Sequence, residues 1–188
     1  IFDMLEAINL EDKNDIENIF LYKGKIMEKK GFYKEAIEYF DRAIEVNPKN
    51  AEIFDKKGSS LYYLGRSTDN MKFVEESIIY YRKALEVDKE YFHPLNGIAV
   101  SLEVLGNTNE ALIYYDKALK AYPNFVLVHF NKANLLMNLN RDEEALYHYD
   151  RAIQINKYYI DAYVEKAELL CSMGKHSEAL SLLDNILE

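Results

Sequence analysis

Small residues recur along this chain at a nearly constant interval, and this periodicity limits the fold more than any other feature. Three series of positions share one set of intervals, since successive residue numbers within each series differ by 34, 41, 34 and 34. Because three independent series agree, chance is a poor explanation. A fixed period of this length is typical of proteins that repeat one supersecondary unit. The series are Gly24, Gly58, Ala99, Ala133 and Ala167; Ala43, Ala84, Ala118, Ala152 and Ile186; and Ala36, Ser77, Ala111, Ala145 and Ala179.

Each repeat carries two amphipathic helical stripes. In the second repeat, Phe54, Gly58 and Leu61 share one stripe, and Ser77 and Tyr81 begin another, with spacings of three and four residues. Between the two stripes we expect a helix to end at a residue that tolerates positive φ. Each repeat is therefore predicted to be a helical hairpin. The expected helix-ending residues are Gly31, Gly65, Gly106, Asn140 and Gly174.

The residue types at the repeated positions resemble those of the tetratricopeptide repeat (TPR) family. In the first repeat an aromatic residue, a small residue, alanine, an aromatic residue, alanine and proline follow one another in the order that this family shows within its period. No repeat contains the family's Trp, and the later repeats also depart from the pattern in having His129 at an aromatic position and Lys89 and Lys157 where proline is usual. The residues that carry the resemblance in the first repeat are Phe20, Gly24, Ala36, Phe40, Ala43 and Pro48.

The resemblance implies an all-α fold, a right-handed α-α superhelix in which antiparallel helix hairpins stack as one solenoid over residues 1–188. Residues 1–16 are expected to form the second helix of a preceding repeat, with Ala7 at a small-residue position. A single hairpin could not bury its apolar stripe alone, whereas a stack of hairpins can. The expected repeats are 17–50, 51–91, 92–125, 126–159 and a truncated 160–188.

The second repeat is seven residues longer than the others, and the additional residues lie between Gly65 and Ser77. Seven residues is close to two helical turns, which rotates a helix face by only ~20°. We expect the insertion to lengthen the second helix of this hairpin, with Ser67, Thr68 or Asp69 as its N-cap. A tolerated insertion that touches nothing is the alternative.

Composition narrows the range of partners and compartments. With a net charge of −9 and scattered Lys and Arg residues, the chain is not expected to bind nucleic acid. No apolar run approaches the ~18 residues that a membrane span needs, so no membrane insertion is expected. The only cysteine, Cys171, favours a reducing compartment, and a cytoplasmic location is predicted. The first residues lack an initiator Met and a signal peptide, so the chain is expected to be part of a longer protein.

No constellation of residues predicts an enzyme, and no cofactor or metal is expected. The four histidines are spread over three repeats, and His129 is interpreted as a packing residue. Cys171 is expected to be a half-buried apolar residue, because it has no basic neighbour that would lower its pKa. The second tyrosine of each pair, Tyr81 and Tyr115, is expected in the core. Glutamates in the first turn of each second helix complement the helix dipole; they are Glu35, Glu110, Glu144 and Glu178.

The family resemblance implies that the first helix of each hairpin lines a concave groove. The later repeats place apolar residues there, which favours a protein or peptide partner with apolar anchors. Burial of these side chains by neighbouring helices is the alternative. The groove positions carried over by register are Leu21, Lys25 and Glu28; Asp55, Ser59 and Tyr62; Asn96, Val100 and Glu103; Phe130, Asn134 and Met137; and Val164, Glu168 and Cys171.

The sequence thus predicts a non-enzymatic protein-protein interaction scaffold or adaptor that binds a peptide or helix of a partner in its groove. Some TPR proteins grip the C-terminal carboxylate of chaperones with Lys, Asn and Arg. Only Asn131 fits that pattern, so no such carboxylate clamp is expected. Self-assembly into homo-oligomers, through the groove or through apolar ends such as Leu180 and Leu183, is the alternative function.

Overall fold

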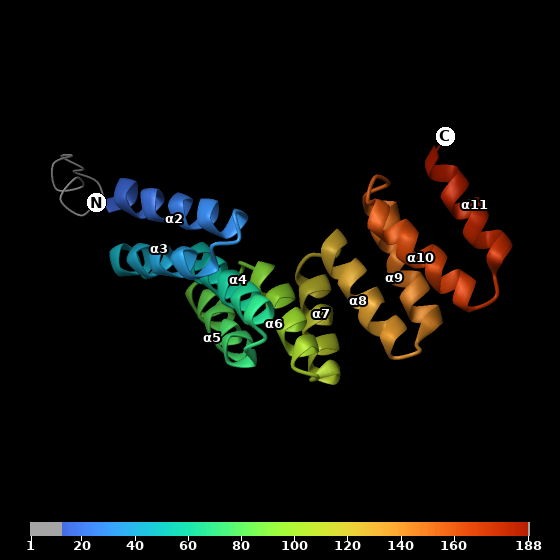
Figure 1. Cartoon of the computed structure of the whole chain (residues 1–188), viewed down its shortest axis with the longest axis horizontal. Helices are drawn as coiled ribbons and strands as arrows, with labels where there is room; N and C mark the ends of the chain where they lie inside the picture. Colours follow the sequence, from blue (N-terminus) through green and yellow to red (C-terminus); the bar gives the residue numbers. More distant parts are fainter. Residues whose placement is uncertain (1–12, 188) are drawn as a thin grey trace. The chain divides into compact units, whose positions relative to one another are not determined.

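A computed structural model describes residues 13–187 of the chain, and these residues form helices without a strand. The all-α prediction is confirmed, since each expected hairpin appears as two consecutive helices joined by a short turn (Figure 1). The helices are α2 (Lys13–Lys29), α3 (Tyr33–Val46), α4 (Ala51–Thr68), α5 (Met71–Val87), α6 (His93–Val104), α7 (Thr108–Ala121), α8 (Val126–Asn138), α9 (Asp142–Ile155), α10 (Ile160–Ser172) and α11 (His176–Leu187).

The helices group into two compact units. Unit 1 extends to Gly106 and contains α2 to α6, and unit 2 begins at Asn107 and contains α7 to α11. Expected repeat boundaries coincide with the first residues of α4, α8 and α10. The boundary expected at Glu17 instead falls inside α2, which begins at Lys13. Most of the preceding half-repeat expected over residues 1–16 lies outside the described residues.

The small residues of the three series lie where helices pack closely. Ala36 and Ala43 on α3 are completely buried, as are their counterparts in the next three hairpins. A Cβ atom on Gly24 would lie only 2.4 Å from the Phe40 ring, so glycine makes room for that aromatic side chain. In unit 2, Ala133 and Tyr149 occupy the same places in a cluster that also contains Leu136. The repeated positions therefore build the core of each unit, as the sequence predicts.

The helix-ending residues are confirmed at four of the five expected positions. Gly31, Gly106 and Gly174 have φ of 81°, 81° and 77°, and Asn140 has φ of 56°. The prediction is wrong at Gly65, because this residue lies inside α4, where it is buried beside Val74. Asp69, with φ of 52°, ends this helix instead.

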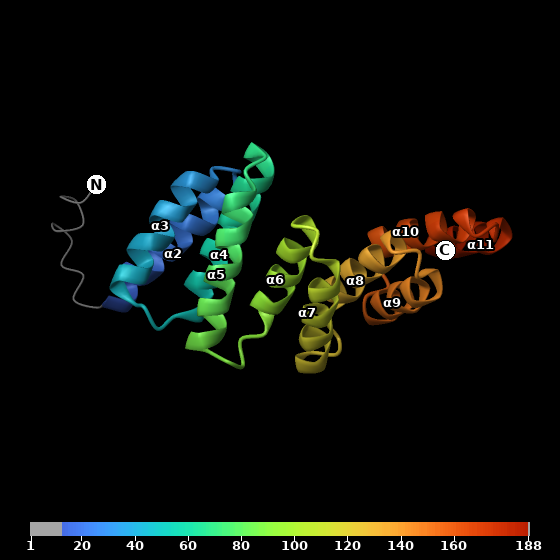
Figure 2. The same ribbon diagram turned by 90° about the horizontal axis from the view of Figure 1, so that it is seen from below.

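The insertion lengthens both helices of the second hairpin, and not the second helix alone as the sequence predicts. Relative to the hairpin α8–α9, α4 gains five residues at its end, α5 gains three at its start, and the turn is one residue shorter. Asn70 is the N-cap of α5, and its side chain accepts a hydrogen bond of 3.2 Å from the Lys72 amide. The predicted caps Ser67 and Thr68 instead donate to the Leu64 carbonyl within α4. Figure 2 shows this long hairpin in teal and green.

Candidate functional site

The predicted groove residues of unit 1 lie on the first helices α2, α4 and α6, and two of them are not available to a partner. Leu21 is only 3% exposed and packs in a core cluster with Phe20 and Phe40, which contradicts its predicted role. Asp55 is 8% exposed and accepts a hydrogen bond of 3.1 Å from the Tyr91 hydroxyl. Leu21 and Asp55 are therefore packing positions in the first two repeats.

Polar contacts join α2 to α4 across the remaining unit 1 positions. Lys25 Nζ lies 2.6 Å from Glu52 Oε1, and the Ser59 hydroxyl donates a hydrogen bond of 2.5 Å to Glu28. Burial raises the pKa of the Glu28 carboxyl, and the hydrogen bond from Ser59 opposes this shift. Burial likewise raises the pKa of Asp55, against the opposing charge of Lys56. The charged and hydroxyl groups at these positions of unit 1 are thus paired with one another by ion pairs and hydrogen bonds.

The other unit 1 candidates are half-buried and of mixed polarity. Tyr62 packs edge-on against the neighbouring Tyr63, with 5.3 Å between ring centroids. Burial raises the pKa of the Tyr62 hydroxyl. On α6 the equivalent positions are occupied by Asn96, Val100 and Glu103, which are also half-buried. Unit 1 therefore offers a mainly polar surface.

The predicted groove residues of unit 2 form a surface of a different kind. We call Phe130, Asn134, Met137, Val164 and Glu168, on the adjacent helices α8 and α10, the unit 2 face. Val164 is 42% exposed, whereas Phe130, Asn134 and Met137 are half-buried and Glu168 is exposed. Neither Phe130 nor Val164 is fully buried, so both side chains present apolar surface to solvent.

Aromatic and amide contacts hold the α8 side of the unit 2 face in place. The Phe130 ring meets Tyr159 edge-on, with 5.2 Å between ring centroids, and a second ring, Tyr149, lies 6.1 Å away. The Tyr149 hydroxyl donates a hydrogen bond of 2.6 Å to Asn134 Oδ1 and lies 3.9 Å from the Met137 sulfur. Burial raises the pKa of this hydroxyl. A side chain fixed on two sides loses little further freedom on binding a partner.

Three carboxylates border Val164 on α10. Asp161, Glu165 and Glu168 follow a helical spacing of four and three residues. Burial and the nearby charges of Glu168 and Asp161 raise the pKa of Glu165. The lysine on the same helix, Lys166, instead pairs with Asp150 on α9 at 2.6 Å. The α10 side of the unit 2 face is therefore negatively charged.

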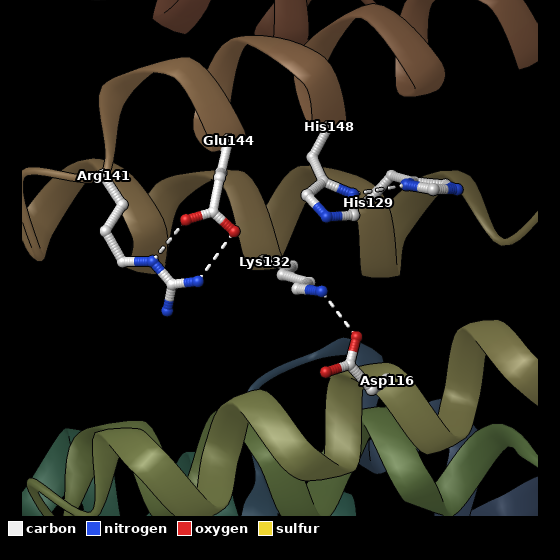
Figure 3. Close-up of polar contacts among 6 residues, drawn as sticks. All are labelled: Asp116, His129, Lys132, Arg141, Glu144 and His148. Atoms are coloured by element: carbon white, nitrogen blue, oxygen red, sulfur yellow. Dashed lines mark hydrogen bonds and ion pairs between the residues drawn. The ribbon is translucent and has the colours of Figure 1, made fainter.

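Pairs of Asp and Lys join successive repeats, and this feature was not anticipated from the sequence. Asp116 on α7 pairs with Lys132 on α8 at 2.5 Å (Figure 3). Equivalent pairs join Asp150 to Lys166 and, in unit 1, Asp41 to Lys57. In each pair the two residues are 16 apart in sequence. This constant separation is the signal that could have revealed them.

A buried pair of histidines connects α8 to α9. His129 Nδ1 lies 2.9 Å from His148 Nδ1 (Figure 3). On the other side of the ring, His129 Nε2 lies 3.0 Å from the Pro123 carbonyl oxygen. Burial, followed by the charge of Lys132, lowers the pKa of His148 to about 4. Burial also lowers the pKa of His129, against the hydrogen bond to Pro123. The prediction that His129 packs in the core is confirmed, since it is 5% exposed.

The described residues offer no metal site, because no three His, Cys, Asp or Glu side chains within 13–187 are grouped to hold an ion.

Cys171 is exposed, which corrects the expectation that it is half-buried. His93 is also exposed and stacks on Phe92 at 4.6 Å. Within the same residues, no helix combines the length and the apolar character of a membrane span.

Two family models match the sequence, and both describe a tetratricopeptide repeat. One matches residues 18–50 and the other residues 96–160. Together the matched segments cover just over half of the chain. No curated protein sequence matches it significantly.

Several solved structures share the fold at low sequence identity. PilF from Pseudomonas aeruginosa superposes with a TM-score of 0.78 at 18% identity, covering 93% of this chain and 77% of PilF. A thermophilic TPR protein from Thermus thermophilus gives a TM-score of 0.75 at 18% identity, covering 90% and 87% of the two chains. YrrB, described as a TPR protein with an unusual peptide-binding site, gives 0.62 at 19% identity, covering 99% and 90%.

Proposed function

Because this chain belongs to the tetratricopeptide repeat family, we propose that it is a non-enzymatic protein-protein interaction module whose unit 2 face binds a peptide of a partner. The observation that carries the proposal is the exposure of Val164, at 42%, on a helix adjacent to the half-buried Phe130. An apolar strip beside fixed polar groups is a common form of a ligand site. The peptide-binding site for which YrrB is described supports this use of the fold.

The charges around the unit 2 face favour a particular class of peptide. Asp161, Glu165 and Glu168 border Val164, and the raised pKa of Glu165 reflects, besides burial, the repulsion among these carboxylates. A Lys or Arg of the partner would relieve that repulsion, and opposite charges across an interface also speed association. The partner segment is therefore an apolar residue flanked by basic residues. An acidic C-terminal tail of the chaperone type would be repelled, so no carboxylate clamp is proposed.

Substitutions on the unit 2 face test this proposal. A fluorescein-labelled peptide library with one apolar residue between Lys or Arg residues would be screened by anisotropy, and the tightest binder would be titrated. We expect Val164→Asp and Phe130→Asp each to weaken binding about tenfold or more, because each places a charge in the apolar contact. Glu165→Lys should weaken binding by reversing the charge that attracts the basic residue.

Ile113→Asp is the matched control, because Ile113 is an exposed apolar residue of unit 2, at 52%, on the second helix α7. This variant should bind as the unmodified chain does. The proposal is wrong if no peptide of this class binds at micromolar concentrations, or if Ile113→Asp weakens binding as much as Val164→Asp. Tighter binding of an acidic C-terminal peptide would contradict the charge argument.

A second candidate function is self-association through an end of the array. It is favoured by Leu180 on α11, which is 66% exposed although its counterpart Leu146 is half-buried beside later helices.

A further inference from the structure

A hollow of about 510 Å³ lies in unit 2 between the second helices α9 and α11. These two helices do not contact each other, and α10 packs against both. A volume of this size is within the range of ligand sites in proteins. We call it the α9–α11 hollow, and its lining includes Leu146 and Asp150 on α9, Lys166 and Leu170 on α10, and Ser181 and Leu182 on α11.

The walls of the α9–α11 hollow are described helices, and a further hairpin would not close it. Among the described residues, α6 contacts α4 and α5 but not α3, and α10 contacts α8 and α9 but not α7. Each first helix thus packs on the hairpin before it and leaves the next second helix back untouched. A first helix that followed α11 would by the same stacking contact α10 and α11, and not the α9 wall.

The α9–α11 hollow exists because α11 has small side chains where α9 has large ones. Ser181 and Leu182 on α11 take the places of Tyr147 and His148 on α9. His148 is only 8% exposed and lies beside Lys132 in its own hairpin (Figure 3). The last repeat therefore lacks a ring that the earlier repeats have at the position of Leu182; those rings are Tyr39, Tyr80, Tyr114 and His148.

The second repeat shows what a tyrosine does at this position. Lys57 Nζ donates a hydrogen bond of 2.9 Å to the Tyr80 hydroxyl and lies 4.0 Å from the centroid of the same ring. This amine also pairs with Asp41 on the preceding second helix. A longer contact of the same kind occurs in the first repeat, where Lys23 Nζ lies 5.8 Å from the Tyr39 ring centroid.

Lys166 has the carboxylate partner that Lys57 has, but not the ring. Its amine pairs with Asp150 at 2.6 Å, and its side chain is 16% exposed, against 7% for Lys57. Within residues 13–187, no aromatic ring lies over the Lys166 amine as Tyr80 lies over Lys57. The negative face of an aromatic ring complements an ammonium group, most strongly where that group is partly desolvated. The α9–α11 hollow thus has the charge and the apolar walls that suit a tyrosine from another molecule.

We propose that the α9–α11 hollow binds the side chain of a tyrosine in an extended segment of a partner protein. The ring would lie over the Lys166 amine, and its hydroxyl would accept a hydrogen bond from Lys166, as Tyr80 does from Lys57. Ser177 and Ser181 on the α11 wall would offer hydroxyl groups to the main chain of the segment. The apolar contacts would come from Leu146, Leu170 and Leu182.

This tyrosine site is separate from the unit 2 face, although both use α10. Lys166 lies two residues after Val164 and two before Glu168. Residues two apart project to nearly opposite sides of an α-helix. The inference is therefore independent of peptide binding at the unit 2 face, and either can fail without the other.

Nuclear magnetic resonance of leucine methyl groups in the intact chain tests the proposal. The probes are acetyl-Gly-Tyr-Gly-amide and its counterparts with Phe or Ala at the centre. We expect the Tyr peptide to shift the methyl signals of Leu146, Leu170 and Leu182 and to saturate at millimolar concentrations. The Phe peptide should bind about threefold more weakly, because it lacks the hydroxyl that accepts from Lys166. The Ala peptide should shift none of these signals.

Substitutions in and beside the α9–α11 hollow identify the site. Leu182→Tyr supplies the missing ring from within the chain, so binding should be lost. Leu180→Tyr is the matched control, because it makes the same change on α11 at a 66% exposed position outside the hollow, and binding should be unchanged. Lys166→Met should weaken Tyr binding about threefold and remove the preference for Tyr over Phe. Circular dichroism would show that each variant stays helical.

Three results would overturn the proposal: no shift of these leucine signals by the Tyr peptide, equal binding of the Tyr and Phe peptides, or loss of binding in Leu180→Tyr. Titration with p-cresol, which is the tyrosine side chain alone, tests the choice of a protein segment. If p-cresol saturates the site at a lower concentration than the Tyr peptide, the main chain contributes nothing and a partner segment is the wrong occupant. None of these results bears on the anisotropy measurements at the unit 2 face.

Discussion

At the scale of single residues, the His129–His148 pair has only one arrangement of protons that fits its geometry. The Pro123 carbonyl can only accept, so His129 Nε2 carries a proton and, in the neutral ring, His129 Nδ1 accepts from His148 Nδ1–H. A further proton on His129 Nδ1 would set two donors against each other. A further proton on His148 Nε2 would add a charge near Lys132. Both rings are therefore held neutral in the folded state.

We expect unit 2 to lose stability in mild acid for this reason. A histidine in the unfolded chain has a pKa near 6.5, and that of folded His148 is lowered to about 4. The unfolded state thus binds a proton first, so stability is complete above pH 6.5 and falls as the pH drops toward 4. The expected loss at pH 4 is about 3 kcal/mol. Urea unfolding followed by circular dichroism between pH 7 and pH 4 would measure it.

The double variant His129→Phe/His148→Tyr is the matched control, because Phe54 and Tyr80 occupy these places in the second repeat and pack in one cluster. It should remain folded and lose most of the acid sensitivity between pH 6.5 and pH 4. An equal acid sensitivity in the variant would assign the effect to carboxylates elsewhere in the chain.

Sequence reasoning located the buried residues well where a repeated position always carries a small or aromatic side chain. Tyr81 and Tyr115 are 5% and 0% exposed, as predicted. It failed for Leu21 and Asp55, which share a helix position with the 42% exposed Val164. The register places a residue on a helix face, but burial there depends on which side chains lie beside it. The contact between His148 and His129 also could not be predicted, because Tyr or Leu occupies the position of His148 in the other repeats.

At the scale of helices, the seven additional residues act as a self-contained addition to the tip of one hairpin. Removing residues 66–72 would join Gly65 to Phe73 and give the order Gly-Phe-Val-Glu-Glu-Ser, closely matching Gly-Phe-Tyr-Lys-Glu-Ala at residues 31–36. We expect this deletion variant to fold, with an unfolding free energy within about 2 kcal/mol of the intact chain. Thermal and urea unfolding would measure the change. A variant that fails to fold would show that the tip is required by unit 1.

Substitution of Gly65 shows whether the turn has moved in the shortened chain. In the intact chain a Cβ atom would lie 2.7 Å from Val74 Cγ2 and 3.0 Å from the Asn70 carbonyl oxygen, so we expect Gly65→Ala to cost roughly 1–3 kcal/mol through crowding. In the deletion variant Gly65 would take the place of Gly31, whose φ is 81° and whose surroundings are open. There the cost should be about 1–2 kcal/mol and arise from backbone strain. Proton chemical shifts of residue 65 would distinguish the two conformations.

The wrong prediction for the end of α4 shows how far the repeat period alone can locate a helix end. Counting from Gly58 assigns Gly65 the role of Gly31, because Gly31 and Gly65 are one repeat period apart. The actual end depends on where the next residues can leave the helix, and Asp69 and Asn70 provide both the positive φ and the next N-cap. Local capping groups therefore outweigh the spacing. Elsewhere the two agree, and the helix ends at Gly31, Gly106, Asn140 and Gly174 were predicted correctly.

At the scale of the whole molecule, the helices differ in how many neighbours support them. In unit 1, α4 packs against α2, α3, α5 and α6, whereas in unit 2 the last helix, α11, packs only against α10 among the described residues. The stability of a repeat array is the sum of repeat and nearest-neighbour contributions, so end helices open first. We expect backbone amides of α4 to exchange slowest and those of α11 fastest. Hydrogen exchange followed by mass spectrometry would measure this, and equal rates in the two helices would contradict it.

The exposed thiol of Cys171 allows the chain to be labelled at one position beside the unit 2 face. It is the only cysteine of the chain, and it shares the helix position of Met137 on the unit 2 face. A maleimide dye attached there would report the arrival of a peptide without any substitution in the chain. The same thiol could also link two copies through a disulfide at that face. Mass measurements made in air without a reducing agent would then record a covalent dimer formed through Cys171, with dissolved oxygen as the oxidant.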